Sequence, residues 1–144
     1  MTLALKDFEG DWQITRRIEE RHSGRIGQLQ GRAVFAPDSD GLNYTESGLL
    51  EFPGQQPLTA TQRYLWRSEN NEIAVFFADG RAFHQFDPSQ PHPQASHDCP
   101  PDWYDVRYEF TDWPNWRATW SVTGPRKDYV SVTEYHRYSV SRKT

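Results

Sequence analysis

Charged side chains alternate with apolar ones in two segments of this sequence. Arg16 lies between Ile14 and Ile18, and Glu46 follows Tyr44 by two residues, so in an extended chain each shares a face with apolar neighbours. Burying one charge alone costs on the order of several kcal/mol, so we expect Arg16 and Glu46 to pair with each other or with a ligand. The plainer interpretation is that they only satisfy each other, or lie at a solvated mouth.

Three tyrosines are candidates for the same interior. Tyr64, Tyr104 and Tyr135 share the parity of the inward-facing residues on their segments. A phenol hydroxyl both donates and accepts hydrogen bonds, so these side chains suit a polar, planar or anionic ligand better than a lipid. In an enzyme, Tyr104 or Tyr135 with Arg16 and Glu46 would do acid–base work on a carboxylate substrate.

Histidine and cysteine gather around a proline-rich stretch. His84 precedes this stretch, and His97, Asp98 and Cys99 lie near its end. Imidazole and thiolate are zinc ligands, but this spacing matches no standard zinc motif, and no residue is identified that would orient a Cys99–His97 nucleophile pair. We therefore expect no metal and no cofactor. In the plainer interpretation, His97 and Asp98 hydrogen-bond the loop closed and Cys99 packs as a small apolar residue.

A basic turn is the remaining candidate for anion binding. Arg126 and Lys127 follow Gly124-Pro125, and two cations on a tight turn would hold a carboxylate or phosphate. The alternative is a charged hairpin turn in which Asp128 pairs with Arg126. Counting alternating strands places this turn beside the end of the proline-rich stretch, with Arg81 at the opposite end of the fold. The predicted ligand cluster at that mouth comprises His84, His97, Asp98, Arg126 and Lys127.

The elements that must position these residues have a period of two. Alternation and turn residues predict strands over 11–20, 26–35, 42–51, 58–67, 73–78, 81–86, 104–110, 116–122 and 129–140. Glycines at 27 and 31 permit the sharp bend of a barrel corner. The stretch 87–102, rich in proline, is expected to be a long loop that acts as a lid or binding loop.

Short turns between nine or ten strands indicate a meander, and a long meander usually closes on itself. The predicted fold is therefore all-β, a single antiparallel up-and-down β-barrel that fills residues 1–144 as one domain. A two-sheet sandwich is the alternative.

The two ends of the meander resemble the calycin superfamily of lipocalin-like barrels. Gly10-Asp11-Trp12 opens the first strand, and Tyr135-His136-Arg137 lies late in the last one. In calycins, a basic residue at that place packs over the indole, so the resemblance implies that Arg137 stacks on Trp12.

Three further motifs resemble an uncharacterised bacterial family of small calycin-like proteins. They are 79–84 (DGRAFH), His97-Asp98-Cys99 with Asp102 and Tyr104, and 124–129 (GPRKDY). That resemblance implies the barrel and a bacterial cytoplasmic setting, and it transfers no catalytic residue. The chain lacks the glycine-rich first strand of haem-binding nitrobindins, which argues against a haem role.

Composition excludes several classes of protein. The net charge of −4 argues against a nucleic-acid partner. No apolar run is long enough to cross a membrane. One cysteine and the lack of a signal-peptide pattern favour a cytoplasmic location. The 6 Trp, 7 Tyr and 8 Phe predict an aromatic core.

The function that the sequence favours is small-molecule binding inside the barrel, with a polar, aromatic or anionic ligand. One alternative is an acid–base enzyme of lyase or isomerase type that uses the same cavity. A second is a packed structural or interaction barrel without a ligand, whose exposed aromatic residues pair two copies into a homodimer. A cavity of several hundred cubic ångströms would favour the first two.

Overall fold

Ten strands follow a short 3-10 helix in the computed structural model, which describes residues 2–138. The elements are η1 (Leu5–Phe8), β1 (Gly10–Glu20), β2 (Ile26–Pro37), β3 (Leu42–Glu51), β4 (Leu58–Glu69), β5 (Glu72–Phe77), β6 (Ala82–Phe86), β7 (Gln94–Cys99), β8 (Asp102–Glu109), β9 (Trp116–Thr123) and β10 (Asp128–Arg137). The last positions of the strand expected over 129–140, 139 and 140, lie outside the described residues. No helix within residues 2–138 is long and apolar enough to span a bilayer.

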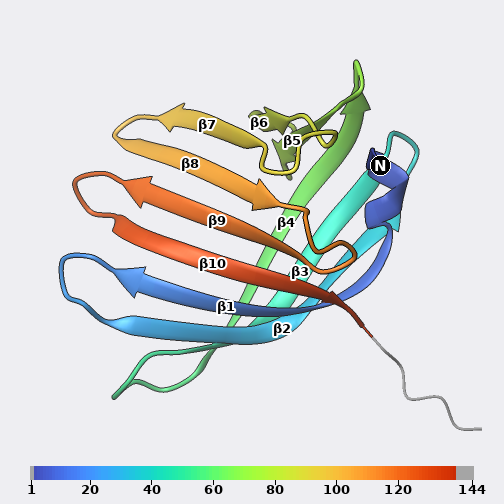
Figure 1. Ribbon diagram of the computed structural model, residues 1–144. Helices are drawn as coiled ribbons and strands as arrows, with labels where there is room; N and C mark the ends of the chain where they lie inside the picture. The colour runs from blue at the N-terminus through green and yellow to red at the C-terminus, as the bar shows by residue number, and fades with distance from the viewer. Residues whose placement is uncertain (1, 139–144) are drawn as a thin grey trace, which may run out of the picture.

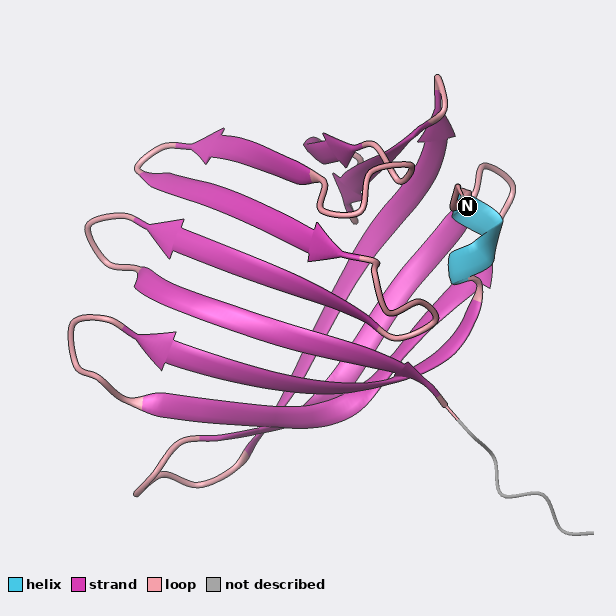
Figure 2. Ribbon diagram, in the orientation of Figure 1, coloured by secondary structure: helices cyan, strands magenta, loops and turns pink. Residues whose placement is uncertain are grey.

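All ten strands form one antiparallel sheet that curls into a nearly closed barrel (Figures 1 and 2). The order along the sheet is β6-β5-β4-β3-β2-β1-β10-β9-β8-β7, so the first and last strands pair in its middle. The free edges of the sheet are β6 and β7, which approach each other without a hydrogen-bonded ladder. The all-β up-and-down barrel predicted from the alternation is confirmed.

Side chains of β6 close the seam between β6 and β7 through contacts with Tyr108 on β8 and with His97 on β7. The Nε2 atom of His84 lies 2.8 Å from the hydroxyl oxygen of Tyr108. Phe86 packs on the Tyr108 ring with centroids 4.3 Å apart, and Phe83 meets His97 edge-on at 5.3 Å. Aromatic contacts thus replace backbone hydrogen bonds along this line.

The prediction of a long loop over 87–102 is wrong for the second half of this stretch, which contains β7. Residues 94–99 pair with β8 from Gln94↔Arg107 to Cys99↔Asp102 and alternate between exposed and half-buried. The prolines lie at 88, 91, 93, 100 and 101, so they flank this segment and leave its backbone donors free to pair. Proline marks the two boundaries of a strand here, not a structureless loop.

The additional strand also reverses one predicted placement. In an antiparallel meander each strand moves the chain to the other end of the barrel. With β7 present, the turn that carries Arg81 falls at the same end as the β9–β10 turn, whereas the sequence had placed Arg81 at the far end. Five turns between consecutive strands meet at this end, which we call the open end.

The opposite end, the capped end, is filled with aromatic rings beneath η1. Phe8 is fully buried and packs edge-on against Trp116, with centroids 5.3 Å apart. The indole N–H of Trp12 donates to the Phe8 carbonyl oxygen at 2.8 Å, which fixes η1 over the barrel. Trp116 in turn stacks on Tyr135 at 3.7 Å, and this plug separates the capped end from the interior above it.

Arg137 completes the capped end as the calycin resemblance implied. Trp12 and Arg137 are register partners, and the guanidinium lies 3.9 Å from the centre of the indole. Its Nη1 and Nη2 atoms donate to the carbonyl oxygens of Glu9 and Asp7, each at 2.7 Å. The predicted stack is therefore confirmed, and Arg137 also links β10 to the end of η1.

Two glycines allow β2 and β3 to bend together. Gly31 and Gly48 are register partners, and a Cβ atom added at Gly31 would lie 2.1 Å from the Ser47 carbonyl oxygen. A side chain there would push the two strands apart, so the tight curvature of the barrel depends on glycine at this crossing.

Arg137→Ala removes both the stack on Trp12 and the two hydrogen bonds to the carbonyl oxygens of Asp7 and Glu9. We expect the free energy of unfolding to fall by about 1–3 kcal/mol, measured by urea denaturation. Arg107→Ala on the exposed face of β8 is the control and should change stability by less than about 0.5 kcal/mol. Equal effects of the two substitutions would contradict this role of Arg137.

Candidate functional site

A cavity of about 340 Å³ lies between the aromatic plug and the open end. Strands β1, β3, β4, β8, β9 and β10 supply most of its wall, which combines aromatic rings with buried polar groups. The residues that line it include Arg16, Tyr44, Glu46, Gln62, Tyr64, Phe83, His84, Tyr104, Tyr108, Trp120, Tyr129, Ser131, Thr133 and Tyr135. The barrel is therefore not packed through, and the structure argues against the interpretation as a solid structural barrel.

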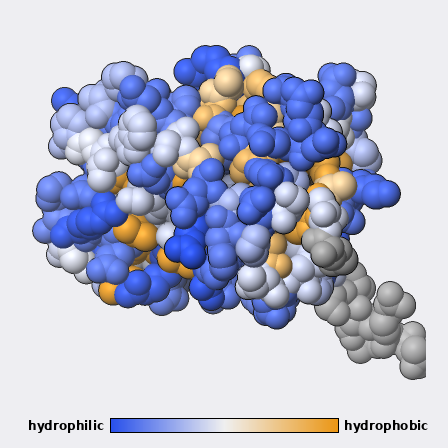
Figure 3. Space-filling model, turned by 45° about the horizontal axis from the view of Figure 1, so that its top comes forward, coloured by the Kyte–Doolittle hydropathy of each residue, from blue (hydrophilic) through white to orange (hydrophobic). Residues whose placement is uncertain are grey.

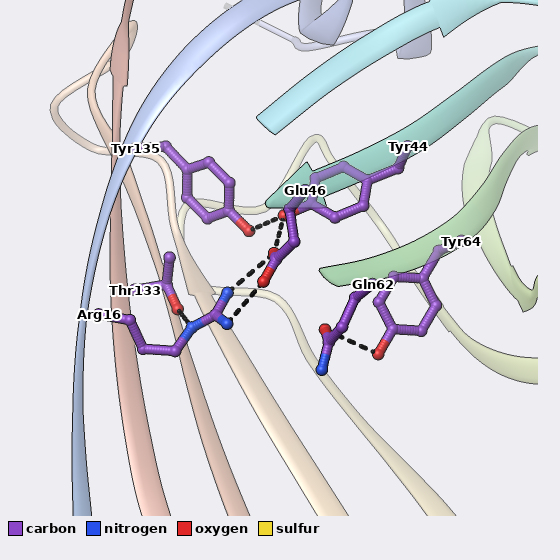
Figure 4. Close-up of polar contacts among 7 residues, drawn as sticks. All are labelled: Arg16, Tyr44, Glu46, Gln62, Tyr64, Thr133 and Tyr135. Carbon is purple, nitrogen blue, oxygen red and sulfur yellow. Dashed lines mark hydrogen bonds and ion pairs between the residues drawn. The ribbon is translucent and has the colours of Figure 1, made fainter. Parts of the chain in front are cut away.

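An ion pair crosses the interior at the inner end of this cavity (Figure 4). Arg16 on β1 donates from Nη1 and Nη2 to the two carboxylate oxygens of Glu46 on β3, at 2.6 and 2.9 Å. Its Nε atom donates to the Thr133 hydroxyl oxygen at 2.6 Å. The side chains are only 13% and 4% exposed. Of the alternatives that the sequence left open, the mutual pair is the one present.

Two tyrosines extend the pair into a hydrogen-bond chain. The Tyr44 hydroxyl donates to Glu46 Oε1 at 2.5 Å, and the Tyr44 and Tyr135 oxygens are 2.8 Å apart. Because the Tyr44 proton is used by the carboxylate, Tyr135 is the donor in the second bond. Opposite this chain, Tyr64 donates to Gln62 Oε1 at 3.2 Å (Figure 4).

These contacts fix the protonation of the cluster. Burial alone would lower the pKa of Arg16, but the hydrogen bonds and negative charge of Glu46 outweigh it and raise that pKa. Burial raises the pKa of Tyr44 and of Tyr135, and burial with the Glu46 charge raises the pKa of Tyr64 to about 12. At neutral pH the tyrosines are therefore hydrogen-bond donors and acceptors, not bases.

His84 forms the wall toward the seam. Burial, and then the nearby His97, lowers its pKa from 6.5 to about 3, so the ring is neutral at physiological pH. Nε2 is engaged by the Tyr108 hydroxyl, while Nδ1 is buried and has no hydrogen-bond partner among residues 2–138. The imidazole acts here as a neutral wall residue and not as a charged anion ligand.

A second group of polar side chains lies at the open end. Lys127 donates from Nζ to the Tyr104 hydroxyl oxygen at 3.1 Å and lies 3.4 Å from the Asp102 carboxylate. The hydrogen bond to Tyr104 raises the pKa of Lys127 further. His97 is the register partner of Tyr104, with ring centroids 6.2 Å apart. This rim places the Lys127 cation next to Tyr104, which lines the cavity.

The structure brings most of the predicted site residues together. Six of them line the cavity: Arg16, Glu46, Tyr64, His84, Tyr104 and Tyr135. His97 packs behind Phe83, and Lys127 lies on the rim. Asp98 and Arg126 are exposed and absent from the lining, because Asp98 alternates with the half-buried His97 and Arg126 occupies the tip of its turn. The predicted five-residue cluster is thus incomplete.

Sequence reasoning assigned no ligand role to several lining residues. Tyr44 and Thr133 have the inward parity of Glu46 and Tyr135, and that parity was the available signal for the hydrogen bonds they make. Phe52 gave no such signal, because it follows β3 in a proline-glycine break. It lines the cavity because its ring packs over Gly27, where a Cβ atom would lie 2.5 Å from it.

The fold and cavity define a lipocalin-like barrel with an open interior. Its fold is similar to that of the S-type phycobiliprotein lyase CPES from Guillardia theta, with a TM-score of 0.65 over 95% of this chain and 92% of that one. The sequence identity is 8%, so the likeness concerns the fold. The chain belongs to DUF6314, a family of unknown function, whose family model matches residues 8–137. No curated protein matches the sequence.

Glu46→Leu leaves the buried Arg16 charge without its partner. We expect this change to lower the free energy of unfolding by about 3–5 kcal/mol, and the double variant Arg16→Met/Glu46→Leu to recover most of the loss. Urea denaturation measures both. Arg17→Ala, which breaks the exposed Arg17–Glu19 pair, is the control and should cost at most about 1 kcal/mol. A double variant as unstable as Glu46→Leu would show that the pair is not the cause.

The lowered pKa of His84 predicts a pH dependence of stability. The unfolded chain binds a proton at this residue below about pH 6.5, whereas the folded chain does so only near pH 3. Stability from neutral His84 is therefore present above pH 6.5 and falls as the pH drops, by about 2 kcal/mol between pH 7 and 5. In urea denaturation, the free energy of unfolding of His84→Gln should fall by about 2 kcal/mol less than that of the wild type between pH 7 and 5. An unchanged pH slope in this variant would contradict the prediction.

Proposed function

We propose that this protein binds a small organic molecule with a flat, unsaturated body and at least one hydrogen-bond-accepting oxygen. The observation that supports this proposal most strongly is the cavity of about 340 Å³, which ends on a buried polar cluster instead of an aliphatic floor. That volume lies toward the small end of the range typical for ligand sites. The likeness to a phycobiliprotein lyase supports a barrel that holds a small molecule.

The flat body is inferred from the walls. Trp120 and Phe83 are stacked at 5.1 Å with 10° between their planes, and Tyr104 meets Phe83 edge-on. These rings offer large, rigid apolar surfaces to a bound ring system. Tyr64 and Tyr129 add aromatic faces that also carry a hydroxyl.

The hydrogen-bond-accepting oxygen of the ligand is inferred from the N–H donors of Arg16 that have no acceptor within the polar cluster. A guanidinium has five N–H groups, and Arg16 uses three of them on Glu46 and Thr133. The two others remain for a carbonyl or carboxylate oxygen of a ligand. Because Arg16 and Glu46 neutralise each other, the inner end itself requires no charge on the ligand, and Lys127 on the rim is the cation that would favour an anion.

Acid–base catalysis in the same cavity has less support. The raised pKa values of Tyr44 and Tyr135 make both hydroxyls poor bases at neutral pH. A tyrosine acting as a proton donor remains compatible with the geometry, and an activity screen on carboxylate substrates would reveal it. Ligand binding without catalysis requires only the hydrogen-bonding and aromatic side chains that line the cavity.

A pair of substitutions on β9 tests the proposal. Ala118→Leu adds volume inside the cavity, and Thr119→Leu introduces the same side chain on the outer side of the strand. We expect a library of flat carbonyl and carboxylate compounds to include binders that raise the Tm of the wild type and of Thr119→Leu. The same compounds should bind Ala118→Leu at least ~10-fold more weakly.

Ser131→Leu, on the neighbouring wall strand β10, repeats the test if Ala118→Leu does not fold. Isothermal titration gives the dissociation constants. Equal affinity for the cavity-filling variants and the wild type would place binding elsewhere and contradict the proposal.

A further inference from the structure

The first part of β4 has a strand partner on one side only. Leu58 to Arg63 pair with β3, whereas the ladder with β5 begins at Tyr64↔Phe77. Figure 1 shows β4 running on well past the short strands β5 and β6. Among residues 2–138, one row of backbone N–H and C=O groups over 58–63 is therefore left without a neighbouring strand.

This edge carries few of the features that protect natural sheet edges. Such edges are usually short, bulged, interrupted by proline or rich in charge. Here Pro57 precedes the strand, and Arg63 is the one charged residue in 58–63, which otherwise includes two β-branched threonines. Leu58 is 60% exposed, and Leu49 on the neighbouring strand is 47% exposed. Figure 3 shows that one face of the molecule is mostly hydrophilic, with apolar patches among the polar side chains.

The same edge borders an opening in the cavity wall. Gln62 lines the cavity and is nevertheless exposed, because β5 ends before it reaches this level. Leu58 and Ala60 share the inward side of β4 with Gln62. A strand added to this edge would therefore extend the wall where it is interrupted.

We propose that two copies of this chain pair antiparallel along this edge, β4 to β4, and complete each other's cavity wall. A two-fold axis perpendicular to the sheet makes one residue face its own copy. Centred on Thr61, the pairing sets Thr61 opposite Thr61, Ala60 opposite Gln62 and Thr59 opposite Arg63. No like charges face each other, and Tyr64 keeps its partner Phe77 on β5.

The residues of this edge are suited to pairing with a second copy of the same edge. The symmetric register uses each edge residue of 59–63 in both copies, and its central threonine pair is a favourable cross-strand neighbour. On the inner side, Ala60 of the second copy lies opposite Gln62 and continues the wall there. This proposal concerns assembly, and it stands independently of the ligand.

Sedimentation velocity of the purified full chain tests the pairing. We expect a species of twice 16.9 kDa for the wild type at micromolar concentration. In Thr59→Lys/Thr61→Lys, lysine faces lysine at the centre and Arg63 on either side, so the dimer dissociation constant should rise at least ~10-fold. Thr15→Lys, on the exposed face of β1 opposite Glu134, is the matched control and should remain dimeric.

A wild type that stays monomeric up to about 200 μM, a value well above the range of ordinary specific dimers, would overturn the proposal. A dimer that the double variant leaves intact would also overturn it, because the interface would then lie elsewhere. Hydrogen exchange of the wild type is the second measurement, which needs no variant. The amides of 58–63 should lose protection on dilution below the dissociation constant, and protection independent of concentration would contradict the pairing.

Discussion

The interior of this barrel depends on one interaction, the buried ion pair between Arg16 and Glu46. These residues come from β1 and β3, and β2 lies between them, so the pair forms only because the sheet curls tightly at Gly31 and Gly48. Replacement of a buried ion pair by apolar residues of similar volume is often neutral or stabilising. Stability alone therefore does not account for the pair, whereas the proposed function gives it a role at the end of the cavity.

The two ends of the barrel have different roles because different residues close them. Trp12, Arg137 and η1 seal the capped end with stacked rings and hydrogen bonds to backbone carbonyls. At the open end, the strands differ in length, and β4 runs past β5. The polar cluster lies between these ends, largely buried and still connected to solvent through the cavity. A site with that placement strengthens hydrogen bonds to any ligand that reaches it.

Much of the fold could be predicted from the sequence, because apolar and polar residues alternate along a strand that has one buried face and one exposed face. The inward parity that placed Arg16, Glu46 and Tyr135 in one interior follows from that rule. Strand β7 was missed because prolines on both sides outweighed a weak alternation, and its omission inverted the end of the barrel assigned to Arg81. The hydrogen bonds between particular hydroxyl and carboxylate groups depend on distances across the barrel. A pattern along the chain carries no information about these distances. The same holds for the gap beside β4, which follows from the length of β5.

The most direct test of the account is nuclear magnetic resonance of the Arg16 guanidinium during titration with flat carbonyl or carboxylate compounds. The Nε–H of Arg16 is held by Thr133 inside the cavity, and the indole N–H of Trp120 reports on the wall, while Trp103 on the outer face serves as an internal control. The account predicts that saturable binding shifts the Arg16 and Trp120 signals and leaves the Trp103 signal unchanged. Saturable binding that shifts Trp103 and leaves Arg16 in place would contradict a ligand site built on the buried ion pair.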